Sequence, residues 1–170
     1  MDDILNGLTK RALDKQKENK KYFARLKKRT PKTLDLTVQK IHDKVFEKTD
    51  CLACANCCKT TSPIFTEKDI QRISKHLKMK ESKFIDQFLQ RDEDDFYVLH
   101  SAPCTFLMGD NTCLIYDVRP KACSEYPHTN RRKFIQLADL TIKNTEVCPA
   151  AFEIVEDLKK AIPLGLKPGN

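Results

Sequence analysis

The segment CLACANCC places four thiols, those of Cys51, Cys54, Cys57 and Cys58, within eight residues. Such a cluster could bind a metal ion or an iron–sulfur cluster, form a redox centre, close a disulfide knot, or consist of small apolar residues buried in a core. The other cysteines and the composition of the chain help to decide among these chemistries.

The remaining four cysteines are dispersed and lie in the motifs PCTF, NTCLIY, KACSEYP and EVCPAA, as Cys104, Cys113, Cys123 and Cys148. Each lies in a predicted turn or next to a proline, whereas cysteines buried as small hydrophobes would lie inside strands and helices. Bends in the chain suit ligands that converge from distant segments. Eight thiols also satisfy the count for two four-thiolate centres. We therefore predict that all eight cysteines are metal ligands.

The spacing within CLACANCC indicates that its cysteines are not equivalent. A C-x2-C pair can bind one ion from a single tight turn. In a continuous helix Cys51, Cys54 and Cys58 would share one face, and Cys57 would point about 100° away from Cys58. We therefore expect the adjacent pair to serve two centres, or one member to be a ligand and the other structural or redox-active.

The identity of the metal stays open between Zn2+ and an iron–sulfur cluster. Structural zinc sites usually use two C-x2-C knuckles, and one region of this chain offers them. Three close cysteines, followed far downstream by Cys148-Pro149, are similar to iron–sulfur ligation, although the ferredoxin run has its fourth cysteine three residues later. The pattern therefore favours an iron–sulfur cluster slightly.

Other polar residues are weaker candidates for chemistry. His128 follows Cys123 by five residues and could be a ligand or a hydrogen-bond donor to one. Arg119, before Pro120, is expected to tie its loop by hydrogen bonds to carbonyl groups or to the sulfurs of the cluster. A cysteine nucleophile would need a base, and no Cys/His/Asp pattern stands out, so we predict no catalytic residue and a non-enzymatic protein.

Composition bounds the class of protein and its partners. The chain has 170 residues and a formal charge of +7, but eight thiolate ligands would bring that charge to −1. The basic run at 17–32 therefore predicts a solvated helix face and no specific nucleic-acid binding. No apolar run approaches the roughly 18 residues that span a bilayer, so we expect no membrane partner. A further protein partner stays open.

The compartment affects how the eight cysteines are interpreted. The start, MDDILNGLTKRALDKQ, is acidic at once and lacks the apolar stretch of a signal peptide, so we expect a cytoplasmic protein. Because reducing compartments keep thiols reduced, this location favours metal binding over a disulfide framework.

The elements that must position the thiols are predicted to form a mostly helical α+β fold. Residues 1–48 read as an N-terminal helical extension of two helices, residues 49–162 as the cysteine-cluster metal-binding domain, and residues 163–170 as a flexible tail. Periodic apolar residues predict helices from Thr66, where Asp69 replaces the usual glutamate of a capping box, from Ser82, and from Pro149. Predicted strands lie at 96–100, on both sides of a Gly-Asp-Asn turn at 109–111, and at 133–142.

These motifs, in order, carry a family resemblance. CLACANCC, TEKDIQRISKHL, PCTFL, CLIYDVRPKACSEYP and the final Cys-Pro together resemble the CxxCxxCC cysteine-cluster family of the YkgJ type, a zinc- or iron-chelating domain. The resemblance covers roughly residues 50–152 and implies that all eight cysteines occupy the family's cysteine positions. Ala55-Asn56 replaces the glycine-rich pair that the family commonly has there. Similar domains occur in flagellin lysine N-methylases, but a glycine-rich cofactor loop is absent here.

The sequence therefore predicts a cytoplasmic metal-binding protein with a structural, redox or accessory role, whose cofactor is an iron–sulfur cluster, Zn2+ or both. Two alternatives remain. The chain could be a metallochaperone or a partner of a modifying enzyme such as a protein lysine N-methylase, or it could be a disulfide-stabilised structural protein.

Overall fold

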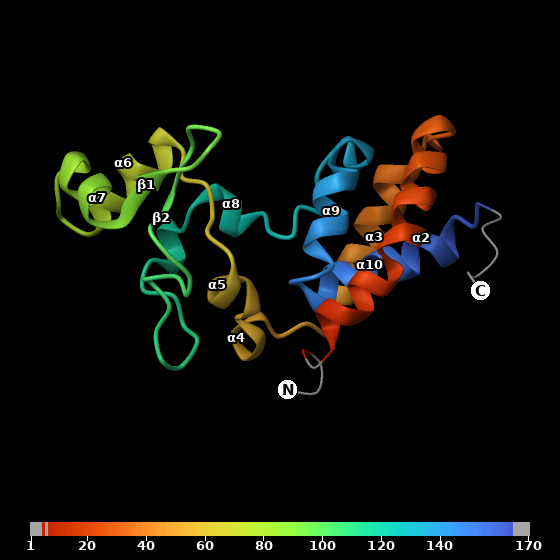
Figure 1. Cartoon of the computed structure of the whole chain (residues 1–170), viewed down its shortest axis with the longest axis horizontal. Helices are drawn as coiled ribbons and strands as arrows, with labels where there is room; N and C mark the ends of the chain where they lie inside the picture. The colour runs from red at the N-terminus through yellow and green to blue at the C-terminus, as the bar shows by residue number, and fades with distance from the viewer. Residues whose placement is uncertain (1–4, 6, 165–170) are drawn as a thin grey trace. The chain divides into compact units, whose positions relative to one another are not determined.

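A computed structural model describes residue 5 and residues 7–164 (Figure 1). The contacts between residues divide this part of the chain into two compact units. The described residues up to Asp50 and those from Pro127 onward form one, the helical unit. Cys51–Tyr126 form the other, the cysteine unit.

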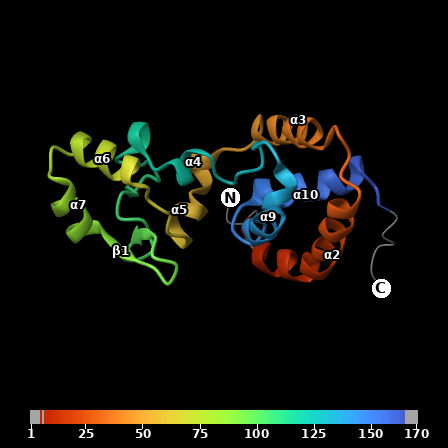
Figure 2. The same cartoon turned by 90° about the horizontal axis from the view of Figure 1, so that it is seen from above.

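The helical unit contains α2 (Leu8–Lys28), α3 (Leu34–Phe46), a 3-10 turn (Phe134–Leu137), α9 (Ala138–Asn144) and α10 (Pro149–Ala161). Helix α10 packs against both α2 and α3, and α9 packs against α2 (Figure 2). The two helices predicted within residues 1–48 are therefore present, as α2 from Leu8 and α3 from Leu34. The first residues of the former lie outside the described part.

A single apolar core holds the helical unit together. Tyr22 and Phe23 of α2, Val38 of α3 and Leu158 of α10 are almost completely buried in it. The Tyr22 hydroxyl donates hydrogen bonds to the carbonyls of Leu158 and Ile162, both at 3.1 Å. This hydroxyl therefore fastens α2 to the end of α10 inside the core.

The strand predicted at 133–142 is wrong, because this segment forms the 3-10 turn and α9. Phe134, Ala138 and Ile142 are buried together in the core of the helical unit. On a strand Leu140 would share a face with Ala138 and Ile142, yet Leu140 is 40% exposed, whereas Thr141 is buried. The aromatic and β-branched content of KFIQLADLTI indicated a strand, but the buried residues follow the three- and four-residue spacing of a helix.

The cysteine unit is built from short elements. They are α4 (Cys51–Cys54), α5 (Asn56–Thr60), α6 (Glu67–His76), α7 (Glu81–Phe88), β1 (Leu89–Arg91), β2 (Tyr97–Leu99), a 3-10 turn (Tyr116–Val118) and α8 (Lys121–Ser124). Strands β1 and β2 form an antiparallel pair in which Leu89 lies opposite Leu99. The core of the cysteine unit contains Phe65, Ile73, Phe84 and Phe106, together with both of these leucines. The mostly helical α+β fold is thus confirmed, with one small sheet in the described residues.

Two local predictions in this unit have different outcomes. At Thr66 the predicted capping box forms, since Thr66 Oγ1 accepts a hydrogen bond from Asp69 N and the Asp69 carboxylate accepts one from Thr66 N. The cap predicted at Ser82 is wrong. Helix α7 begins at Glu81 after Lys80, and no side chain caps it.

The two compact units meet along the chain after Asp50 and after Tyr126. The segment after Pro127 packs with α2 and α3, because α9 and α10 contribute Ala138, Ile142 and Leu158 to the same core. That residues 1–48 and 49–162 act as separate domains stays a prediction, and most of the predicted tail lies outside the described residues. No described helix combines the length and the apolar character that crossing a membrane requires.

Candidate metal centre

The CLACANCC segment forms two single helical turns rather than one helix. Helix α4 ends at Cys54, and Ala55 takes a left-handed conformation with φ 47° and ψ 16° before α5 begins. The continuous helix on which Cys51, Cys54 and Cys58 would share one face therefore does not form, since it is interrupted between Cys54 and Cys58. Left-handed backbone favours glycine, and Ala55 occupies it at the position where the resemblance leads one to expect glycine.

Cys58 is tied to the next cysteine along the chain. The Cys104 N–H donates a hydrogen bond to the Cys58 carbonyl at 2.8 Å. Cys104 and Cys113 flank a turn that Leu107 and Cys113 close as an isolated antiparallel bridge. The two short strands predicted around this turn are thus reduced to one bridge.

Helix α8 carries Cys123. It is a single turn that follows Pro120, and Cys123 N donates to the Pro120 carbonyl at 2.9 Å. Just before it, Arg119 Nη1 donates to the Tyr116 carbonyl at 2.7 Å, and the guanidinium lies 3.9 Å from the centre of the Tyr116 ring. The prediction that Arg119 ties its loop through carbonyl hydrogen bonds is confirmed.

The pKa values show that four thiols influence one another. Burial, followed by the charges of Cys58, Cys104 and Cys113, raises the pKa of Cys123 to about 12. Burial also raises the pKa of Cys104, with added repulsion from Cys58 and Cys113, and it raises the pKa of Cys113, with added repulsion from Cys58. Because charge interactions decline with distance, these mutual effects, together with the backbone hydrogen bond between Cys104 and Cys58, indicate that Cys58, Cys104, Cys113 and Cys123 belong to one neighbourhood. We call them the four-thiol group.

Cys58 differs from the rest of the group. A hydrogen bond with Cys57 lowers the pKa of Cys58 from 9.0 to about 7, although burial opposes this shift. Cys58 is therefore the thiol of the group that ionises first. In the described part of the chain, no three His, Cys, Asp or Glu side chains already form a metal-binding arrangement. The thiols are thus gathered without forming a closed coordination sphere.

The other predicted ligands have different surroundings. Cys51 is exposed, whereas Cys54 and Cys57 are half-buried in the same unit. Cys148 belongs to the helical unit, where its Sγ accepts a hydrogen bond from Ala151 N at 3.5 Å and caps α10. His128 also belongs to the helical unit. Among the eight predicted ligands, charge interactions thus connect Cys58, Cys104, Cys113 and Cys123.

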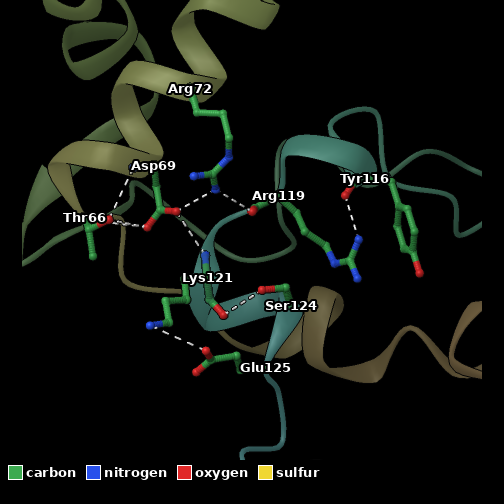
Figure 3. A network of polar contacts seen from close by, with 8 residues as sticks. All are labelled: Thr66, Asp69, Arg72, Tyr116, Arg119, Lys121, Ser124 and Glu125. Atoms are coloured by element: carbon green, nitrogen blue, oxygen red, sulfur yellow. Dashed lines mark hydrogen bonds and ion pairs between the residues drawn. The ribbon is translucent and has the colours of Figure 1, made fainter.

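A polar network joins α6 to the segment that leads into α8 (Figure 3). The buried carboxylate of Asp69 accepts hydrogen bonds from Thr66, from Arg72 Nη2 at 2.7 Å and from Lys121 N at 3.1 Å. Arg72 Nη2 also donates to the Arg119 carbonyl at 2.9 Å. The sequence indicated Asp69 as a helix cap only. An arginine three residues after a capping aspartate was the available sign of a larger role.

A family model matches residues 50–149, which is more than half of the chain and includes all eight cysteines. The chain belongs to the CxxCxxCC family. The family is described as a "putative zinc- or iron-chelating domain". Family membership and the eight cysteines support a metal-binding role for this CxxCxxCC protein, with zinc or iron as the metal. Comparison with curated proteins and with solved structures gave no match.

Proposed function

We propose that the four-thiol group of the cysteine unit is a metal centre that holds Zn2+ or an iron–sulfur cluster. Two features carry this proposal: the backbone hydrogen bond from Cys104 N to the Cys58 carbonyl at 2.8 Å, and the mutual charge effects among Cys58, Cys104, Cys113 and Cys123, which come from four separate segments of the chain. Four thiolates form the ligand set both of structural zinc sites and of iron–sulfur clusters. Thiolate ligands also disfavour calcium and magnesium, which prefer oxygen.

The electrostatics of the four-thiol group favour a bound metal cation. The raised pKa values of Cys104, Cys113 and Cys123 arise from burial and from repulsion between thiolates. A metal cation offsets both causes, because it neutralises the negative charge that burial and repulsion oppose. Binding then releases the protons that these thiols hold near neutral pH. Cys58, with a pKa near 7, is the thiol best prepared to make the first metal bond.

The remaining four cysteines are proposed as further ligands. Cys51, Cys54 and Cys57 supply the C-x2-C-x2-C spacing, which keeps the slight preference for an iron–sulfur cluster. Cys148 is kept as the eighth ligand. A Cys148→Ser variant tests that assignment by its metal content.

We further propose a cytoplasmic protein in which the centre has a structural, redox or accessory role. The description of the family as zinc- or iron-chelating supports cysteines kept as thiolates for metal, and a reducing location favours that state. Alkylation under denaturing conditions followed by mass spectrometry should find the cysteines reduced in protein from cells. Four native disulfides would contradict this proposal. A metallochaperone remains the alternative, and it would transfer its metal readily to a competing thiol ligand.

Elemental analysis and a visible spectrum of protein purified without oxygen test the metal centre directly. Zinc without visible absorption, or iron with sulfide and a charge-transfer spectrum, is the expected result. A Cys123→Ser variant should lose metal from one centre. The hydroxyl of its neighbour Ser124 donates to the Lys121 carbonyl of its own turn, so Ser124→Ala is the matched control that should retain the metal. Metal-free wild-type protein, or full metal content in Cys123→Ser, would contradict the proposal.

A further inference from the structure

Both carboxylate oxygens of Asp69 accept hydrogen bonds, and one of them also binds a segment outside α6. Oδ2 accepts hydrogen bonds from Thr66 N at 2.9 Å and Thr66 Oγ1 at 2.6 Å, which completes the cap of α6. Oδ1 accepts from Arg72 at 2.7 Å and from the backbone N–H of Lys121, 52 residues further along the chain, at 3.1 Å. Asp69 is 1% exposed, so the bond to Lys121 is made away from solvent.

Arg72 holds the other side of the same short segment. Its Nη2 bridges Asp69 Oδ1 and the Arg119 carbonyl, the latter at 2.9 Å. The two backbone groups that Asp69 and Arg72 hold, Arg119 C=O and Lys121 N–H, lie on either side of the buried Pro120. Figure 3 shows both contacts reaching from α6 to this segment. Asp69 and Arg72 together form what we call the α6 clamp.

The clamped segment leads directly to a predicted ligand. Helix α8 begins at Lys121 and has four residues, including Cys123. A single helical turn does not persist by itself in water, because nucleation costs more than one hydrogen bond returns. Helix α6, by contrast, is anchored by Ile70 and Ile73 in the core of the cysteine unit. The place of Cys123 therefore depends on a contact with a rigid neighbour.

We propose that Asp69 and Arg72 are positioning residues for the metal centre, since they fix the backbone that presents Cys123 to the other three thiols. This inference rests on the proposed function, because positioning matters only if the four-thiol group binds metal. The clamp orders the ligand segment before metal arrives. Less ordering entropy is then lost on binding, and the metal is released more slowly.

Variants of the clamp separate this role from general stability. In Asp69→Asn the amide has a single oxygen, so it can serve either Thr66 or the Lys121 side, and its NH2 then faces a donor. Arg72→Met removes the bond to the Arg119 carbonyl from a partly exposed side chain and should leave the fold intact. Thr66→Ala weakens the cap of α6 but leaves the bond to Lys121 in place. Asp117→Asn changes an exposed carboxylate that lines one surface pocket together with Asp69 and Arg72.

The experiment loads each full-length protein with Co2+, whose sulfur-to-cobalt absorption increases with the number of thiolate ligands. Release to a chelator should be about tenfold faster in Asp69→Asn and Arg72→Met, as for outer residues of other metal sites. The Asp69→Asn spectrum should also lose the contribution of about one thiolate in four. Thr66→Ala should have a lower melting temperature but wild-type release, and Asp117→Asn should match wild type in both.

Each outcome has a defined meaning. Wild-type release and spectra in both clamp variants would overturn the inference and leave the metal centre standing. Equal acceleration in Thr66→Ala would also overturn it, because general stability of α6 would then explain the effect. A wild-type protein without thiolate–cobalt absorption would overturn the proposed function and, with it, the positioning role.

Discussion

Replacing Cys58 by serine should damage the metal centre far more than replacing its neighbour Cys57. Four-ligand zinc sites contribute about 10–16 kcal/mol of apparent binding free energy, so one ligand accounts for about 2.5–4 kcal/mol. At about 1.4 kcal/mol for each factor of ten, Cys58→Ser should weaken binding to the four-thiol group by two to three orders of magnitude. The structure supports this choice, because Cys58 interacts with Cys104, Cys113 and Cys123.

Cys57 acts on the same centre indirectly. Its hydrogen bond lowers the pKa of Cys58 from 9.0 to about 7. Without that bond Cys58 stays protonated at pH 7, and the metal must displace one more proton. Two pKa units correspond to at most about a hundredfold change, and solvent screening of the half-exposed thiol reduces the expected effect of Cys57→Ala to about tenfold. Cys57→Ser keeps a hydroxyl donor, so binding should be weakened less.

Competition with a chromogenic chelator at pH 7 and at pH 9 measures these differences. The deficit of Cys57→Ala should shrink as the pH rises toward 9, because Cys58 then ionises without the hydrogen bond. The deficit of Cys58→Ser should persist, since a ligand is missing at every pH. Wild-type affinity in Cys58→Ser would refute the four-thiol centre. Equal losses in the Cys57 and Cys58 variants at both pH values would refute their distinct roles.

Three further predictions follow from local features. Metal affinity should rise with pH, and most steeply below about 7, because below that pH Cys58 is protonated as well as Cys123 and binding must release one more proton. Metal-free protein should lose stability as the pH rises from about 9 toward 12, since the raised pKa of the buried Cys123 keeps it protonated in the folded state while the unfolded chain ionises; titration and melting curves would show both effects. Ala55→Gly should raise the free energy of unfolding by up to about 1 kcal/mol by relieving left-handed backbone, whereas Ala53→Gly within α4 should lower it by about 0.5–1 kcal/mol in urea unfolding. Tyr22→Phe should cost about 1–3 kcal/mol in the same assay, because two carbonyls at the end of α10 lose a buried donor, with metal content unchanged.

Local signals in the sequence predicted the ends of two helices correctly. Thr66 with Asp69 marked the start of α6, and Pro149 occupies the first turn of α10. Both signals depend on residues within one helical turn, so their physics is contained in a short segment. The same short range along the chain explains why the carbonyl hydrogen bond of Arg119 could be predicted, since its partner, Tyr116, is three residues away.

The grouping of the thiols could not be predicted in this way. The bond from Cys104 to Cys58 and the clamp from Asp69 to Lys121 join segments that are distant in sequence, so no spacing rule reports them. The left-handed Ala55 was equally hidden, because alanine is the residue that most favours a continuous helix. Tertiary contacts therefore decided which cysteines meet, whereas the number and type of the candidate ligands were already evident.

Because the cysteine unit interrupts the helical unit in the sequence, it affects the order in which the two units can fold during synthesis. Helix α3 ends at Phe46 and α10 begins at Pro149, so about 100 residues separate them. At roughly 5–20 residues per second, the apolar face of α2 and α3 waits about 5–20 s for its partner helix. The cysteine unit is complete at Tyr126, well before that partner emerges. A nascent chain can therefore gather its four-thiol group, and meet its metal, while the apolar faces of the helices made first still lack the helix that covers them.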